Sequence, residues 1–192
     1  MIEEIKYKLN SNNLEKPSGQ VQAAVLIAIL NYGKYIKNPE LIYTQRSSHL
    51  STHSGEVSFP GGKAEEDDEN LFATALRESS EEMNLNGEDI TVLGKLDYLI
   101  SRHKVEVNPF VVTVDSPQPF KPNQEIQEIF TVPLSFLLDL KNIQRERIER
   151  QGMAWQVPTW NHNNQKIWGL TAIITVNFLN LCFDANIEIL EG

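Results

Sequence analysis

The 192-residue sequence predicts an α+β fold. Strand-like segments rich in apolar and β-branched residues are mixed with helical segments, without the regular alternation of a doubly wound parallel sheet. The length and the ordinary hydrophobic fraction of 41% suit one well-filled domain, which we expect to span residues 1–192.

Turn-forming residues divide the first part of the chain into short elements. Residues 1–9 alternate weakly between apolar and polar and are expected to form a short helix within an N-terminal extension of residues 1–20. Residues 21–30 and 41–46 are strongly apolar, which predicts two strands. The Ser-Phe-Pro-Gly-Gly sequence at residues 58–62 predicts a loop, because proline and glycine interrupt regular structure.

Residues 69–85 carry the clearest helical pattern. Phe72, Leu76, Ser79 and Met83 follow the i, i+4, i+7, i+11 spacing of one helix face. We expect this stripe to pack against the core.

The remaining segments predict further strands and two more helices. Pro133 suits the first turn of a helix, and residues 168–181 are apolar almost all round, which is typical of a buried helix. The expected strands are residues 90–100, 105–114, 126–132 and 148–157, and the expected helices are residues 134–140 and 168–181.

Charge and cysteine content exclude several classes of protein. The net charge of −9, from 17 basic and 26 acidic residues, argues against a nucleic-acid partner. Cys182 is the only cysteine, so an intrachain disulfide is impossible. Residues 1–10 do not resemble a signal peptide, and the apolar run at residues 21–30 is too short to span a bilayer. We therefore expect a cytoplasmic protein without a membrane partner, either a monomer or a homodimer.

Three glutamates lie close together on the predicted helix. Glu78, Glu81 and Glu82 occupy positions i, i+3 and i+4 and would share the face opposite the apolar stripe. A solvated acidic face is one interpretation of this pattern. The other is a site for a hard divalent cation such as Mg²⁺ or Mn²⁺, because carboxylate oxygens are its preferred ligands.

The segment from Gly62 to Leu85 resembles the Nudix box. It contains Gly62, an acid at Asp68 or Glu69, the run Arg77-Glu78-Ser79-Ser80-Glu81-Glu82, and Asn84 in place of the usual glycine. Asparagine tolerates a left-handed backbone better than most residues, so a helix end at Asn84 is reasonable. The resemblance implies a Nudix-type fold, a mixed sheet packed between helices in an α/β/α sandwich, with the box at residues 62–85.

The segment before the box is similar to the signature of the coenzyme A pyrophosphatase subgroup. The matching residues are Leu41 to Ser47, which include Arg46, then Gly55 and Phe59-Pro60-Gly61-Gly62. Ser51 stands where the subgroup has arginine. Further similar segments follow at residues 101–111, 122–137 and 167–172. The resemblance implies hydrolysis of the diphosphate bond of coenzyme A or a derivative, giving 3′,5′-ADP and 4′-phosphopantetheine or its acylated form.

The resemblance also implies roles for individual residues. Mg²⁺ or Mn²⁺ would be held by Glu78, Glu81 and Glu82, with a carbonyl of Gly61 or Gly62 as a further ligand. The implied catalytic residues are Glu81, Glu82, Glu125 and Arg77, where Glu125 is the candidate general base and Arg77 orients the box through Asp68 or Glu69. The implied substrate-binding residues are Arg46, Ser47, His53 and Arg102, with His49 as a further candidate. A surface cation or a local hydrogen bond is the alternative role for each of these.

Two alternatives to the coenzyme A assignment are open. The box is common to Nudix enzymes that act on ADP-ribose, NADH or nucleoside triphosphates, and Ser51 weakens the subgroup assignment. The second alternative is a Nudix-fold module that binds a nucleotide without cleaving it. Such modules typically lose box glutamates, and all three are present here.

Overall fold

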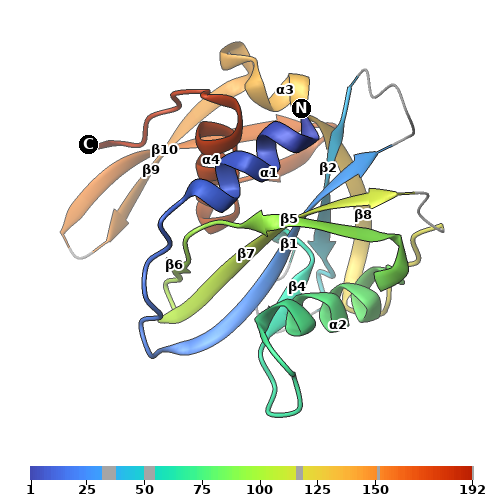
Figure 1. The fold of residues 1–192 in the computed structure, drawn as a ribbon. Helices are drawn as coiled ribbons and strands as arrows, with labels where there is room; N and C mark the ends of the chain where they lie inside the picture. The colour runs from blue at the N-terminus through green and yellow to red at the C-terminus, as the bar shows by residue number, and fades with distance from the viewer. Residues whose placement is uncertain (32–37, 50–54, 116–118, 151, 192) are drawn as a thin grey trace.

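The structure, a computed structural model, describes residues 1–31, 38–49, 55–115, 119–150 and 152–191 (Figure 1). Its helices are α1 (Ile2–Ser11), α2 (Leu71–Met83), α3 (Leu134–Leu138) and α4 (Gly169–Phe183), with short 3₁₀ turns at Gly87–Asp89 and Leu140–Asn142. Its strands are β1 (Val21–Asn31), β2 (Glu40–Arg46), β3 (Val57–Ser58), β4 (Gly61–Lys63), β5 (Ile90–Lys95), β6 (Leu99–Ile100), β7 (Val105–Asp115), β8 (Ile126–Pro133), β9 (Ile143–Arg150), β10 (Met153–His162), β11 (Gln165–Ile167) and β12 (Leu190–Glu191).

β1 is the central strand of the larger sheet. It runs parallel to β7 over its whole length and antiparallel to β2 and β4. The strand order is β3-β2-β1-β7-β5, while β8 pairs with β2 and β6 pairs with β7. The sheet is therefore mixed, as predicted.

The two faces of β1 belong to different halves of the core. Leu26 and Leu30 pack in one apolar cluster with Ala75 and Met83 of α2. Ile27 points to the opposite face and packs in a second cluster, to which α1 and α4 contribute. Helix α2 therefore covers one face of the sheet and α1 with α4 covers the other (Figure 1). The predicted α/β/α arrangement is confirmed.

Helix α4 matches the buried helix predicted at residues 168–181. The Tyr43 and Thr175 hydroxyls lie 3.1 Å apart in a hydrogen bond that ties α4 to β2. Cys182, on the same helix, is buried. Within the described residues, no helix is long and apolar enough to cross a membrane.

A smaller sheet lies beside this sandwich. β9 and β10 form an antiparallel hairpin that extends from the body of the molecule, and β11 and β12 pair with β10 (Figure 1). Trp160 of β10 is fully buried, and its Nε1 donates to the Leu137 carbonyl at 3.2 Å. This contact fixes the base of the hairpin to α3.

Several predicted element boundaries are wrong. Residues 148–157 do not form one strand, because the chain reverses between β9 and β10, where Gly152 has a φ of 78°. Residues 90–100 divide into β5 and β6, with a bulge next to Gly94 in β5. The loop predicted at residues 58–62 includes parts of β3 and β4, and α3 ends at Leu138 rather than Leu140.

A buried carboxylate ties the N-terminal segment to the sheet. Glu106 of β7 is fully buried and accepts hydrogen bonds from the main-chain N–H and hydroxyl of Ser18, both at 2.6 Å. Gln22 and Asn108 donate to its other oxygen at 2.8 and 3.1 Å. Burial alone would raise the pKa of Glu106, but these donors outweigh it and lower the pKa to about 2.

Candidate functional site

Helix α2 carries the predicted box glutamates and has a cap at each end. Before its first turn, the Asn70 side chain accepts hydrogen bonds from the N–H groups of Phe72 and Ala73 at 2.9 and 3.0 Å. At its other end Asn84 adopts a left-handed conformation with φ 57°. The helix therefore ends where the sequence predicts.

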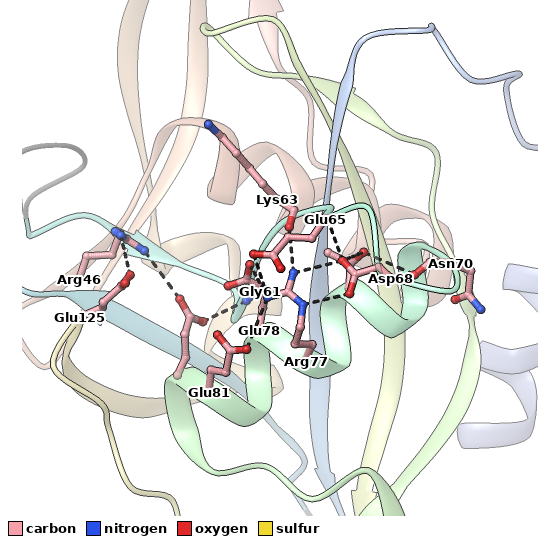
Figure 2. Close-up of polar contacts among 12 residues, drawn as sticks. Arg46, Gly61, Lys63, Glu65, Asp68, Asn70, Arg77, Glu78, Glu81 and Glu125 are labelled. Atoms are coloured by element: carbon pink, nitrogen blue, oxygen red, sulfur yellow. Dashed lines mark hydrogen bonds and ion pairs between the residues drawn. The ribbon is translucent and has the colours of Figure 1, made fainter.

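Arg77 holds the loop before α2 against the helix. Its Nε and Nη2 donate to the two carboxylate oxygens of Asp68 at 2.9 and 3.1 Å, and Nη2 also donates to the Lys63 carbonyl at 3.1 Å (Figure 2). Asp68 accepts further hydrogen bonds from Thr74 and from the Glu65 N–H. The Arg77 partner is thus Asp68 rather than Glu69, and the Arg77 guanidinium holds the pKa of Asp68 well below its usual range.

Two glycines allow the loop to lie close to β1 and α2. Gly61 has a φ of 141°, and a Cβ there would overlap the Ala24 carbonyl. A Cβ on Gly62 would overlap the Glu78 carboxyl group. Only glycine fits at position 61, because the backbone of β1 occupies the space that a side chain would need, whereas a side chain at position 62 would displace the Glu78 carboxyl group.

Glu82 lies on the buried face of α2, and the prediction that the three glutamates share an outward face is wrong. The buried face includes Ala75 and Ser79, whereas Phe72 and Leu76 of the predicted stripe are only half-buried. Small side chains at positions 75 and 79 let α2 approach the sheet closely. That packing turns Glu82 toward β4, where its Oε2 accepts a 3.0 Å hydrogen bond from the Gly61 N–H.

The environment of Glu82 disfavours its charged form. Its side chain is only 5% exposed, and burial raises its pKa to about 7. The Gly61 N–H and Arg46 act in the opposite direction, whereas Glu78 and Glu125 raise the pKa through charge repulsion. A carboxylate that is buried near two others is poised to gain from a bound cation.

Glu78 and Glu81 differ in their exposure. Glu78 is 21% exposed and accepts a 3.1 Å hydrogen bond from Arg77, and burial is the main cause of its raised pKa. Glu81 is 59% exposed and lies 3.6 Å from Arg77. Glu81 is therefore the most accessible of the three carboxylates to solvent.

Arg46 at the end of β2 connects Glu82 with Glu125. Its Nη1 lies 3.7 Å from Oε1 of Glu82. Its Nη2 donates to Oε2 of Glu125 at 3.2 Å, and Figure 2 shows this pair. The Ser47 N–H donates to the Glu125 carbonyl at 2.7 Å, so the two segments are also joined through the backbone. The structure thus brings the predicted residues Arg46, Ser47, Glu82 and Glu125 together.

The donor chemistry of these residues fits a hard divalent cation. Charge repulsion from Glu125 raises the pKa of both Glu78 and Glu82, so a cation between these carboxylates would relieve the repulsion, and the glycines at positions 61 and 62 place no side chain beside them. As the side chains stand, however, no group of three acidic, histidine or cysteine residues within the described ranges is arranged to hold one ion. Arg46 and Arg77 lie against the carboxylates instead.

The other predicted substrate contacts lie farther along the same edge or outside the described residues. Arg102 is exposed in the turn before β7, and its Nη2 lies 3.4 Å from Glu56, whose carbonyl accepts a hydrogen bond from the Arg46 N–H. His49 is exposed in the turn after β2. His53 and Ser51 fall outside the described residues.

Asn123 is a site residue that the sequence analysis did not single out. Its side chain accepts hydrogen bonds from the N–H groups of Glu125 and Ile126 at 2.9 and 3.2 Å, and its own N–H donates to the Glu82 carbonyl. It therefore links the end of α2 to the segment that presents Glu125. The available signal was an asparagine two residues before a candidate acid, which is the spacing of an Asx-turn.

Known proteins resemble this chain in sequence and in fold. The Nudix domain model matches residues 21–153. The chain is 42% identical over 154 residues to proteins called uncharacterized Nudix hydrolase NudL in Yersinia pestis and Yersinia pseudotuberculosis, over 80% of this chain and 75% of each relative. An Ap4A hydrolase of C. elegans, solved as a binary complex, matches with a TM-score of 0.50 and 21% identity, over 62% of this chain and 85% of that one. This last likeness concerns the fold alone.

Proposed function

The chain belongs to the Nudix hydrolase family, and we propose that its substrate is coenzyme A or a coenzyme A derivative. Water would attack one phosphorus of the diphosphate, and the bond from that phosphorus to the bridging oxygen would break. The products would be 3′,5′-ADP and 4′-phosphopantetheine, or its acylated form. The two protons of the water would end on the new phosphate groups or in solvent.

The observation that carries this proposal is the subgroup signature that runs from Leu41 to Gly62. Its two ends meet at one carboxylate, because the Arg46 guanidinium and the Gly61 N–H both contact Glu82. Signature residues that lie beside the box glutamates, such as Arg46, are close enough to the proposed metal site to influence which diphosphate binds.

The metal-binding role is assigned to the box glutamates. Glu78, Glu81 and Glu82 would hold Mg²⁺ or Mn²⁺, and a carbonyl of Gly61 or Gly62 is a further candidate ligand. When bound, such an ion neutralises phosphate charge and lowers the pKa of a coordinated water. Arg77 would act as a positioning residue, because its bonds to Asp68 and Lys63 hold the glycine loop beside the glutamates.

Glu125 is the proposed general base. Its side chain is 55% exposed at the edge of the carboxylate cluster, so water and substrate can reach it. Arg46 and Ser47 lie next to Glu125 and are proposed to contact the diphosphate, with Arg102 farther along the same edge as a candidate for a second phosphate. His53 keeps its proposed role as an anion contact on sequence grounds.

The test is a comparison of kcat/KM over coenzyme A, acetyl-coenzyme A, ADP-ribose, NADH and a nucleoside triphosphate, each with Mg²⁺ and with Mn²⁺. Products should be separated by chromatography, because a phosphatase-coupled assay would also release the 3′-phosphate of coenzyme A. We expect a coenzyme A compound to give the highest value, with 3′,5′-ADP as the product. A tenfold preference for any of the other substrates would reject the coenzyme A assignment. The Glu82→Gln variant provides the control for contaminating hydrolases.

A further inference from the structure

We propose that Arg46 is a built-in counter-ion of the metal-free site, which leaves its carboxylates when a divalent cation binds and then contacts substrate phosphate. The inference rests on the proposed metal-binding role of Glu82. It adds that metal and arginine compete for the same carboxylates. Metal and phosphate should therefore bind cooperatively, through the movement of one side chain.

The contacts of Arg46 place a positive charge where the cation would have to act. Its guanidinium spans Glu82 and Glu125, which come from α2 and from the segment before β8. Glu82 is buried, so a cation that approaches it must replace the arginine or share the carboxylate with it. Two cations that close to each other repel strongly in a partly buried site. Competition between them follows.

The backbone of Arg46 is fixed, so only its side chain can respond. The Arg46 N–H donates to the Glu56 carbonyl, the Arg46 carbonyl accepts from the Gly55 N–H, and the next residue donates to Glu125. The β2–β8 register shifts between Gln45 and Arg46, an irregularity that re-aims side chains at the end of a strand. A long flexible side chain on a rigid anchor can exchange partners without disturbing the fold.

One donor of the Arg46 side chain is not used by the contacts with Glu82 and Glu125. The Arg46 Nε is buried and has no hydrogen-bond partner among the described residues. A buried donor without a partner is unfavourable. A phosphate has acceptor oxygens enough to engage Nε together with a terminal nitrogen in the two-pronged geometry that arginine favours. A bound diphosphate would therefore give Nε an acceptor while it also contacts a terminal nitrogen.

The experiment measures two affinities in wild type and in Arg46→Gln. The first is the affinity for Mn²⁺ without nucleotide, from the free-Mn²⁺ electron paramagnetic resonance signal at pH 8.5, which lies above the pKa of about 7 of Glu82. The second is the affinity for ADP at saturating Mn²⁺, by calorimetry. We expect Arg46→Gln to bind Mn²⁺ about 5–50-fold more tightly and ADP about tenfold more weakly, magnitudes typical of coupled sites.

The opposite directions of these shifts distinguish the proposal from a structural role. If Arg46 merely supported the site, its loss would weaken both affinities, and that result would overturn the proposal, as would an unchanged Mn²⁺ affinity. Arg102→Gln is the matched control, since it removes the same charge from the same edge but contacts Glu56 rather than the carboxylate cluster. Its Mn²⁺ affinity should stay within about twofold of wild type, well below the smallest coupling expected for Arg46.

Two further variants keep the test decisive. Arg46→Lys retains a cation but cannot bridge two carboxylates in the same way, so its Mn²⁺ affinity should fall between those of wild type and Arg46→Gln. This variant serves if Arg46→Gln does not fold. Glu82→Gln separates the inference from its premise: undiminished Mn²⁺ binding by that variant would refute the metal-site assignment itself. The Mn²⁺ measurements do not depend on whether coenzyme A is the substrate.

Discussion

The main-chain N–H of Gly61 donates a 3.0 Å hydrogen bond to Oε2 of Glu82. This bond joins the loop before α2 to a carboxylate near the end of the helix, so it brings the beginning and the end of the Nudix box into contact. Because Glu82 is almost fully buried, this N–H and the Arg46 guanidinium are what partly offset the loss of water around its charge. Glu82 is therefore unfavourable for folding of the metal-free protein and suited to binding a cation.

Replacing Glu82 with glutamine should stabilise the metal-free protein. The folded-state pKa of Glu82, about 7, lies above the ordinary value of 4.5. Ionisation of Glu82 therefore lowers the free energy of unfolding: the loss begins near pH 4.5, grows as pH rises, and is complete above pH 7. Glu82→Gln should therefore raise the free energy of unfolding of the metal-free protein by at most about 3 kcal/mol. Urea unfolding with EDTA at pH 5 and pH 8.5 should show a larger gain at the higher pH. Activity should fall on the order of 10²–10⁴-fold. Lower stability than wild type at pH 8.5 would contradict the expected stabilisation, and activity equal to that of wild type would contradict the expected loss of activity.

A methyl group at position 62 should disturb the site without disturbing the core. The Cβ of Gly62→Ala would overlap the Glu78 carboxyl group, so this side chain would have to leave its position beside Arg77. We expect weaker Mn²⁺ binding and a loss of kcat/KM of about 10–100-fold, as when the support of a metal ligand is removed. Gly87→Ala is the control, because a Cβ there meets no atom within 4 Å. Equal activities of the two variants would show that catalysis does not depend on this position of the Glu78 side chain.

Removing the charge of Glu106 should loosen the N-terminal segment in a pH-dependent way. The pKa of about 2 lies below the ordinary 4.5, so the carboxylate contributes its full stability above pH 4.5 and loses it as pH falls toward 2. Glu106→Gln should therefore lower the free energy of unfolding at pH 7 by about 1–3 kcal/mol, because a buried donor loses its acceptor.

The difference between Glu106→Gln and wild type should shrink when urea unfolding is repeated at pH 3. The exposed Glu88 provides a matched control, and Glu88→Gln should change stability by less than about 0.5 kcal/mol at either pH. A difference for Glu106→Gln that is the same at pH 7 and pH 3 would show that hydrogen-bonded charge is not the cause.

Spacing along the chain was sufficient to predict some of these relationships. The pairing of Arg77 with an acid nine residues earlier and the left-handed Asn84 both depend on local geometry that the box pattern implies. The α/β/α arrangement was also predictable, because it follows from the family resemblance and from apolar segments long enough to be buried on both sheet faces.

Tertiary packing decided what spacing could not. The buried face of α2 is centred nearer Ala75 and Ser79, whose small size lets the helix approach β1 and β4, whereas the predicted stripe relied mainly on the large residues Phe72 and Leu76, which are only half-buried. Glu82 was therefore assigned to the wrong face. The link from Asn123 to Glu82 joins residues 41 positions apart in a way that depends on the fold, and the β9–β10 hairpin depends on a turn at Gly152 within a continuous strand-like pattern.

The two candidate acids at the start of the box offer a direct test of how Arg77 works. The guanidinium binds both oxygens of Asp68 and the Lys63 carbonyl, whereas Glu69 is exposed. Asp68→Asn keeps the shape of the side chain but replaces one acceptor oxygen with an N–H₂ group. Arg77 should therefore lose its two-pronged contact, and the glycine loop should lose the support that this contact provides. We expect kcat/KM to fall about 10–100-fold, as for loss of a residue that orients a metal ligand, with weaker Mn²⁺ binding and a lower melting temperature. Glu69→Gln should leave all three measurements close to wild type. If kcat/KM falls as much in Glu69→Gln as in Asp68→Asn, the loss of activity results from the negative charge of this segment and not from the Arg77–Asp68 pair.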